Sequence, residues 1–228
     1  RSPLGQSIQR NTVNHHHRRL RVIINRAIKD GIIHNSPYNS FKLKNTKTDR
    51  TYLTEEEISA IVDLDLSNNQ SLERVRDIFF FACNTGVRWS DSSVLTHHNI
   101  ELYEGKKYLR FQMKKTQDPV AVPLTQDALD IIEKYKAEKN FSKDDKLLPK
   151  ISGQKFNNYI KHVAELAGLY KTVTHHVARH TFATVALMND MPIHVVQKIL
   201  GHTKLETTQI YAKTLPKTLF VEMEKFKL

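Results

Sequence analysis

Four side chains between residues 174 and 212 could bind a phosphate group and react with it: His176, Arg179, His202 and Tyr211. His176 and Arg179 are three positions apart, and on a helix this spacing places both side chains on one face. A guanidinium binds a phosphate through two parallel hydrogen bonds, an imidazole exchanges a proton, and a phenol oxygen can attack phosphorus. Residue types and spacing together therefore predict a phosphate site.

Two helices must position these side chains. Apolar residues between 177 and 186 predict a helix packed into a core, and this helix is expected to end at Asn189. A second, shorter helix is expected over residues 191–200, with Gly201 as its left-handed cap. His202 follows this cap directly, where the backbone is held and the side chain can point toward a site.

Each of these residues also has an ordinary structural interpretation, because capping histidines, half-buried tyrosines and surface arginines are common. The pattern that they form together favours a role in chemistry over this structural interpretation. The run HHVARHTFAT is followed by LGH, and Tyr211 comes nine residues after His202. This order resembles box II of the tyrosine recombinases, the lambda-integrase or phage integrase family, in which His-x-x-Arg and Leu-Gly-His precede a nucleophilic tyrosine.

Two further parts of the family pattern lie upstream. Arg88 follows a Thr-Gly turn in TGVRWSD and matches the first arginine of the family. Residues 108–124 alternate apolar and polar side chains and predict a hairpin with its turn at 116–119. Lys115 at the tip matches the hairpin lysine of the family, and Lys114 is the neighbouring alternative.

The resemblance implies that six residues are catalytic: Arg88, Lys115, His176, Arg179, His202 and Tyr211. In this assignment the two arginines hold the non-bridging phosphate oxygens and His202 donates a third hydrogen bond. His176 accepts the tyrosine proton or positions the phosphate, and Lys115 protonates the departing 5′ oxygen. Tyr211 forms a 3′-phosphotyrosyl intermediate, so strands can be rejoined without ATP. No cofactor and no metal ion are expected, because the guanidiniums and histidines supply the positive charge.

A helix is expected over residues 11–31, and it carries three arginines that are predicted to contact DNA: Arg18, Arg19 and Arg26. Lys114 of the hairpin is a fourth expected DNA contact. The alternative for the helix is a solvated basic face. The helix resembles the last helix of the recombinase core-binding domain, so residues 1–42 are expected to be the C-terminal part of a truncated, SAM-like helical domain.

Residues 43–52 are polar and basic and are interpreted as a linker, and residues 53–228 as the catalytic domain. The expected fold is mainly α with a small antiparallel β-sheet or hairpin (α+β), the tyrosine-recombinase catalytic fold. Thr54 and Ser71 are expected to cap the first two helices of this domain. A last helix over residues 216–228 is expected to dock into a neighbouring protomer or to pack on its own domain.

The overall composition favours a polyanionic partner. Lys and Arg number 35 against 24 acidic residues, a net charge of +11. This excess favours nucleic acid over an anionic membrane surface, and a merely soluble basic protein is the alternative. The single cysteine, Cys83, cannot form an internal disulfide, and no segment approaches the ~20 apolar residues of a membrane span. A cytoplasmic protein without a membrane partner is expected.

The favoured interpretation is a site-specific DNA recombinase for integration, excision or inversion of a DNA element. Its expected partners are double-stranded DNA with a specific recombination site, further copies of the chain in a dimer or tetramer, and accessory DNA-bending proteins. A type IB topoisomerase and a non-catalytic DNA-binding regulator are the alternatives. The Leu-Gly-His motif and the short hairpin favour the recombinase, and the filled motif argues against the regulator.

Overall fold

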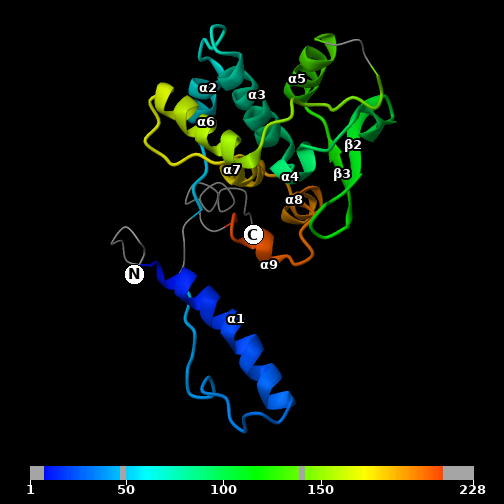
Figure 1. The fold of residues 1–228 in the computed structure, drawn as a ribbon. Coiled ribbons are helices and arrows are strands. Elements are labelled where there is room, and N and C mark those ends of the chain that lie inside the picture. The colour runs from blue at the N-terminus through cyan, green and yellow to red at the C-terminus, as the bar shows by residue number, and fades with distance from the viewer. Residues whose placement is uncertain (1–7, 47–49, 139–141, 213–228) are drawn as a thin grey trace, which may run out of the picture. The chain divides into compact units, whose positions relative to one another are not determined.

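The computed structural model describes residues 8–46, 50–138 and 142–212. The chain divides into two compact units, Arg1–Asp49 and Arg50–Leu228 (Figure 1). The predicted boundaries at residues 42 and 53 are close to this division but stay a prediction. The helix expected over residues 216–228 lies outside the described residues.

The first unit is built on one long helix, α1 (Arg10–Lys29), and a following segment without regular structure that folds back along it. Asn14 is buried and donates from Nδ2 to the carbonyl oxygen of Lys44 at 2.9 Å. His17 Nδ1 lies 2.8 Å from the hydroxyl of Tyr38. These contacts hold the returning segment, yet several apolar side chains of α1 stay exposed: Val13, Leu20, Val22 and Ile23.

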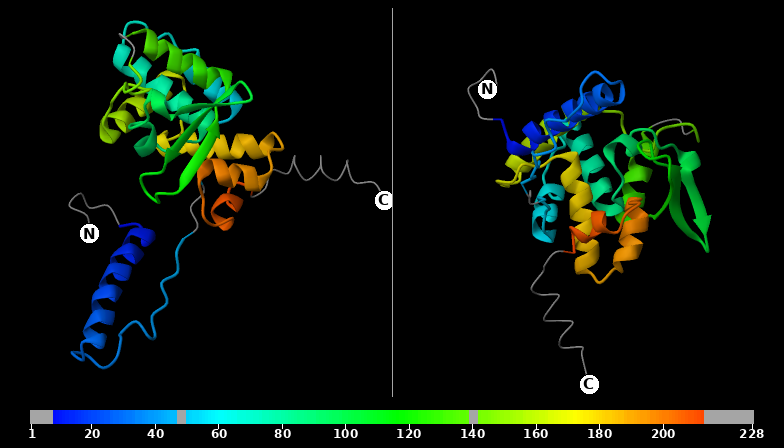
Figure 2. Two further views of the ribbon diagram at one scale, coloured as in Figure 1. Left: turned by 90° about the vertical axis from the view of Figure 1, so that its right-hand side faces the viewer. Right: turned by 90° about the horizontal axis from the view of Figure 1, so that it is seen from below.

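The second unit is a helical body with a small sheet at one edge (Figures 1 and 2). The helices of the body are α2 (Glu55–Val62), α3 (Gln70–Thr85), α5 (Gln126–Ala137), α6 (Gly153–Leu166) and α7 (His175–Met188). Helix α3 contacts all four others. Its Phe79 and Phe81 are 1% and 0% exposed, so the most apolar segment of the domain forms the centre of the core.

The predicted helix starts are partly confirmed. Thr54 and Glu57 form the expected capping box before α2. Ser71 does not cap α3, because Asn69 does so: its side-chain oxygen accepts from the backbone N–H of Leu72 at 3.2 Å. Asn and Ser are equally good caps, and the chain begins the helix at the earlier of the two.

The sheet has three antiparallel strands in the order β1 (Ile100–Tyr103), β2 (Lys106–Gln112) and β3 (Pro119–Pro123). A short 3₁₀ helix, η1 (His97–Asn99), precedes β1. The predicted hairpin is therefore confirmed, and β1 is an addition that the sequence pattern did not indicate. Strand β1 has four residues and no alternation of buried and exposed side chains, so it carries no period-2 signal.

The hairpin loop begins earlier than the predicted turn at 116–119. The backbone N–H of Gln117 donates to the carbonyl oxygen of Met113 at 2.8 Å, and the backbone N–H of Met113 donates to the carbonyl oxygen of Asp118 at 3.0 Å. Gln117 adopts a positive φ of 59°, which lets the chain reverse within these six residues. Lys114 and Lys115 both lie in this loop, and both are exposed.

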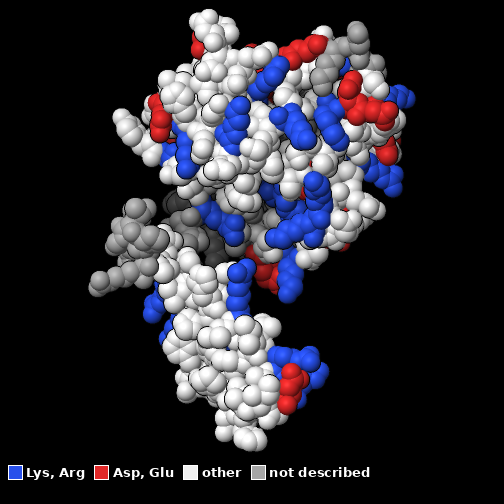
Figure 3. Space-filling view, in the orientation of Figure 1, with Lys and Arg blue, Asp and Glu red and all other residues white. Residues whose placement is uncertain are grey.

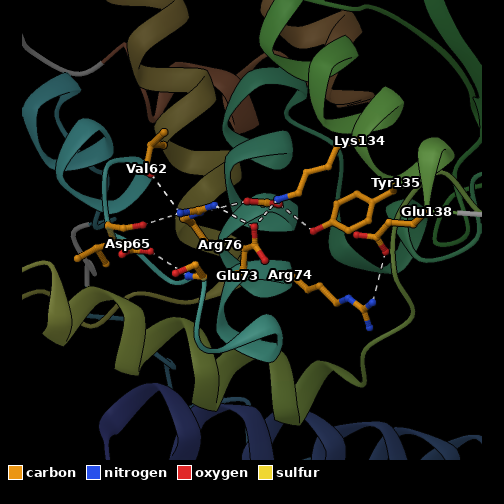
Figure 4. Close-up of polar contacts among 11 residues, drawn as sticks. Val62, Asp65, Glu73, Arg74, Arg76, Lys134, Tyr135 and Glu138 are labelled. Carbon is orange, nitrogen blue, oxygen red and sulfur yellow. Dashed lines mark hydrogen bonds and ion pairs between the residues drawn. The ribbon is translucent and has the colours of Figure 1, made fainter.

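A polar network joins α3 to α5 (Figure 4). Asp77 is 6% exposed and accepts from Lys134 Nζ at 2.6 Å, from the Tyr135 hydroxyl at 2.8 Å and from Arg76 Nε at 3.1 Å. Lys134 also donates to Glu73 at 2.7 Å. A buried carboxylate requires such partners, so this network is structural and fixes the position of α5.

The mainly α fold with a small antiparallel sheet is thus confirmed. Within residues 8–46, 50–138 and 142–212, no helix is long and apolar enough to cross a membrane.

Candidate active site

Arg88 is held at the start of a short helix, α4 (Trp89–Ser92), directly after α3. Gly86 ends α3 with a φ of +65°, and a Cβ there would lie 2.5 Å from the ring of Phe182. Glycine is therefore required for the turn that delivers Arg88. The Arg88 Nη1 lies 2.7 Å from Met113 Sδ and 3.8 Å from Asp91 Oδ2.

Asp91 links Arg88 to the hairpin loop. Its side chain is 2% exposed, and its second oxygen, Oδ1, accepts from the backbone N–H of Lys114 at 2.9 Å. One buried carboxylate thus contacts a guanidinium and the loop that carries Lys114 and Lys115. This carboxylate therefore joins the start of α4 to the hairpin loop.

Arg179 lies on α7 and is 6% exposed. Its Nη1 donates to the carbonyl of Gly86 at 2.7 Å, and its Nη2 donates to the carbonyl of Leu200. These carbonyls belong to the C-terminal ends of α3 and of α8 (Ile193–Leu200). Helix C-termini carry partial negative charge, which favours a cation. Burial and the charge of Arg88 lower the pKa of Arg179, but a guanidinium held by such acceptors stays charged at neutral pH.

His202 follows Gly201, which caps α8 with a φ of +58° as predicted. Its Nε2 lies 3.2 Å from Arg179 Nη2, and its Nδ1 lies 2.9 Å from the Thr208 hydroxyl. Because a guanidinium only donates hydrogen bonds, Nε2 must be the acceptor and Nδ1 carries the proton. Burial, followed by the charge of Arg179, lowers the pKa of His202 to about 4. His202 is therefore neutral at pH 7 and must gain a proton before its Nε2 can donate to a phosphate.

Tyr211 comes after the short helix α9 (Glu206–Gln209) and is 9% exposed. It packs in an apolar cluster with residues of α7 and α8: Ala183, Ala186, Val196 and Leu200. Helices α7 and α8 contact each other (Figure 2). The ring of Tyr211 is stacked at 9° to that of His202, with centroids 6.4 Å apart. The predicted nucleophile therefore lies beside the Arg179–His202 pair.

Two residues at the phenol were missed by the sequence analysis, His180 and Arg50. His180 Nδ1 lies 2.8 Å from the Tyr211 hydroxyl oxygen, and His180 Nε2 lies 3.4 Å from Arg50 Nη1. The signal for His180 was its spacing of four from His176, which places both on one helix face. Arg50 gave no signal, because it is one cation in a basic linker.

His176 is more exposed than these residues. Its ring centroid lies 4.1 Å from that of His175 and 6.4 Å from that of His180. Burial lowers the pKa of His176, and the positive charges nearby lower it further: Arg179, Arg50, Arg88 and Lys115. The hairpin loop therefore lies close enough for the Lys115 charge to act on this histidine.

The structure thus gathers Arg88, Arg179, His202 and Tyr211, with His176 and Lys115 at the exposed side. Cations dominate the site, and Asp91 is the acid in contact with Arg88. Such a concentration of positive charge beside a nucleophile suits an anion whose negative charge increases during reaction.

The other expected DNA contacts lie on α1, in the first unit. Arg18 donates to Asn45 at 2.9 Å, and Arg26 pairs with Asp30 at 2.8 Å. Arg19 is exposed. Arg18 and Arg26 therefore have interactions within their own unit, and all three remain at its surface.

The family is evident from comparison with known proteins. Residues 51–217 match the phage integrase family, and residues 4–46 match the phage integrase SAM-like domain. Tyrosine recombinase XerC of Thermodesulfovibrio yellowstonii is 28% identical over 173 residues, which cover 70% of this chain and 56% of that protein. Tyrosine recombinase XerA of Pyrococcus horikoshii is 32% identical over 203 residues, which cover 82% of this chain and 66% of that protein. The chain therefore spans between half and two thirds of the length of these curated relatives.

Solved structures show the same fold. A structure of the Tn1549 transposon integrase in complex with a circular intermediate DNA superposes with a TM-score of 0.73 at 21% identity, covering 97% of this chain and 81% of that one. The crystal structure of XerA recombinase superposes with a TM-score of 0.60 at 24% identity, and the match covers 87% of this chain and 70% of that one. Since the family match extends over most of the chain, the chain belongs to the phage integrase family.

Proposed function

We propose that this chain is a site-specific tyrosine recombinase that cleaves and rejoins DNA through a 3′-phosphotyrosyl intermediate. Family membership and the names of the curated relatives support this activity. The observation that carries it is the contact chain from Arg179 to His202 at 3.2 Å and from His202 to the stacked ring of Tyr211. A guanidinium and an imidazole thus lie beside the proposed nucleophile.

The positive groups have distinct tasks in this proposal. Arg88 and Arg179 hold the two non-bridging oxygens of the scissile phosphate, and a bound phosphate raises the pKa of His202 so that it can donate a third hydrogen bond. Preorganised donors of this kind act strongest in a site with little water. Arg179 is fixed by two helix ends before any DNA arrives.

The chemical step conserves the phosphodiester. The Tyr211 oxygen forms a bond to phosphorus, and the bond from phosphorus to the 5′ oxygen breaks. His176 accepts the phenol proton, and Lys115 supplies the proton that the 5′ oxygen takes up. Religation is the same sequence in reverse with a new 5′ hydroxyl, so no ATP is consumed.

Double-stranded DNA with a specific recombination site is the proposed substrate. The net charge of +11 favours such a polyanion. On the face shown in Figure 3, Lys and Arg side chains are spread over the middle of the second unit, and acidic side chains lie toward its edges. Arg18, Arg19, Arg26 and Lys114 are proposed phosphate contacts. We also propose assembly of a dimer or tetramer on DNA inside the cell.

The test is covalent capture on a library of nicked duplexes of random sequence. Loss of the short strand beyond the nick prevents religation and traps the intermediate. The wild-type chain should give adducts that resist denaturant, with a phosphate on Tyr211 by mass spectrometry and one preferred sequence at the linked 3′ ends. Tyr211→Phe should still bind DNA and give no adduct.

Two outcomes would overturn this proposal. An adduct formed by Tyr211→Phe would mean that another residue is the nucleophile. Adducts without any preferred sequence, together with relaxation of plasmid by the monomer, would indicate a topoisomerase instead.

A further inference from the structure

The nucleophile has a second set of contacts that the proposed chemistry does not use. The Tyr211 hydroxyl oxygen lies 2.8 Å from His180 Nδ1, and the opposite nitrogen of that ring, Nε2, lies 3.4 Å from Arg50 Nη1. The rings of His180 and Tyr211 have centroids 5.4 Å apart. Arg50, His180 and Tyr211 therefore form one chain of hydrogen bonds that joins residues 161 positions apart in sequence.

The direction of these hydrogen bonds follows from the chemistry of arginine. A guanidinium has donors and no acceptor, so Arg50 must donate to His180 Nε2. The proton of the neutral imidazole is then on Nδ1, and the bond to Tyr211 is donated by His180 and accepted by the phenol oxygen. With its proton already in place, Nδ1 has no lone pair to take the phenol proton.

A second protonation of His180 is disfavoured. Burial, followed by the charge of Arg50, lowers the pKa of His180 to about 4, and His176 and Arg179 act in the same direction. The ring is therefore neutral at pH 7. His202 and the Tyr211 phenol are further titratable groups that interact with this ring.

We propose that His180 is a positioning residue for the nucleophile, held by Arg50 in the tautomer that donates a hydrogen bond to the Tyr211 oxygen. This inference rests on the proposed function of Tyr211. A donated hydrogen bond fixes where the phenol oxygen lies, and it stabilises the negative charge that this oxygen gains as its proton leaves. His180 keeps its own proton throughout, and the phenol proton goes to another acceptor.

Arg50 gives this arrangement a further property. It is the first residue of the second unit. Without its guanidinium, both tautomers of His180 are available, and in one of them Nδ1 accepts from the phenol and no longer stabilises the phenolate. Loss of the Arg50 guanidinium is therefore expected to lower the reactivity of Tyr211.

The test uses two replacements of His180 with opposite expectations. His180→Phe keeps a ring and removes the donor, whereas His180→Asn places an amide N–H where Nδ1 was. His180→Phe should slow covalent capture on the nicked library by about 10- to 100-fold and raise the pKa of the Tyr211 phenol, measured by NMR on tyrosine labelled at the ring carbon that bears the oxygen. His180→Asn should restore most of the rate and lower the phenol pKa again.

A proton acceptor at position 180 would behave differently. In that case His180→Asn would be as slow as His180→Phe, because an amide takes up no proton, and this result would overturn the proposal. Phenol pKa values that are equal in the wild-type chain and in His180→Phe would also overturn it.

Arg50 is tested by Arg50→Gln and Arg50→Leu. The glutamine variant retains a donor for His180 Nε2 and should stay closer to the wild-type rate than the leucine variant. Equal rates for the wild-type chain and Arg50→Leu would remove Arg50 from the proposal. Failure of the wild-type chain itself to form adducts would instead refute the proposed function, so the two failures are distinguishable.

Discussion

Arg88 and Arg179 have the same side chain but different surroundings. Arg179 donates hydrogen bonds to three acceptors, which are two backbone carbonyls and the ring of His202. The side chain of Arg88 is 18% exposed and contacts the thioether of Met113 and the carboxylate of Asp91. In the proposed function, Arg179 therefore combines a structural and a catalytic task, whereas Arg88 is available chiefly for the phosphate. Lysine can replace the charge of either but cannot reproduce the planar fork of donors.

This difference predicts different outcomes for two matched variants. Arg179→Lys should lower the free energy of unfolding by about 1–3 kcal/mol, because buried carbonyls lose their donors. Arg88→Lys should cause a smaller loss of stability. Both should reduce adduct formation by about 100-fold or more. Urea unfolding and covalent capture measure the two effects, and equal stability of the two variants would contradict the structural task of Arg179.

The lysine of the hairpin loop can be identified by changing the leaving group. Lys115→Ala should slow cleavage of normal DNA by about 10²- to 10⁴-fold, the usual contribution of a general acid. A sulfur in place of the bridging 5′ oxygen leaves as a thiolate without a proton, so it should restore cleavage by Lys115→Ala. Lys114→Ala serves as the control, and rescue of that variant instead would assign the acid to Lys114.

At the scale of elements, the site lies where helix ends meet the hairpin. Helices α3 and α8 both end in left-handed glycines, and their last carbonyls bind Arg179. Helix α8 also packs on β3. A Cβ on Gly201 would lie 2.3 Å from the methyl carbon of Met113, whose sulfur contacts Arg88. The end of α8 and the position of Arg88 are therefore coupled through one methionine.

Gly201→Ala should consequently affect both stability and chemistry. The left-handed backbone alone costs about 1–2 kcal/mol with a Cβ, and displacement of Met113 should add to this loss and move Arg88. Gly168→Ala is the matched control, because Gly168 also has a positive φ of 74° but no atom lies within 4 Å of its Cβ position. Thermal unfolding and covalent capture should show a loss of activity only for Gly201→Ala, and equal activity of the two variants would contradict the coupling.

At the scale of the whole molecule, burial, followed by charged and titratable neighbours, makes three histidines around the site hard to protonate. Burial is the first cause of a pKa of about 4 for His175, His180 and His202. Unfolding returns each to the ordinary value near 6.5, so the unfolded chain binds more protons between these two values. The free energy of unfolding should therefore fall as the pH falls from about 6.5 toward 4.

Urea unfolding at pH 7 and pH 5 measures this dependence. The wild-type chain should unfold at a lower urea concentration at pH 5. His175→Asn removes one of the three groups, and the difference between the two pH values should become smaller. A midpoint that stays constant or rises on acidification would contradict neutral histidines in the folded site.

Much of the fold and of the candidate site could be predicted because the signals are local. The capping box at Thr54, the left-handed cap at Gly201 and the alternation in the hairpin each depend on a few neighbouring residues. Ser71 was a wrong cap because Asn69 offers an equivalent side chain two residues earlier. Strand β1 was missed because its four residues show no alternation of buried and exposed side chains, and its pairing with β2 is a contact between separate segments.

The sequence by itself determined which residue types could bind a phosphate, the order in which they occur and the helix ends that present them, since spacing and capping act over a few positions. Only the tertiary structure decided which atoms of these groups meet. The proton on His202 Nδ1, the carbonyls bound by Arg179 and the link from Arg50 through His180 to Tyr211 all depend on packing between distant segments. Hydrogen-bond direction is a property of such contacts, and no spacing along the chain encodes it.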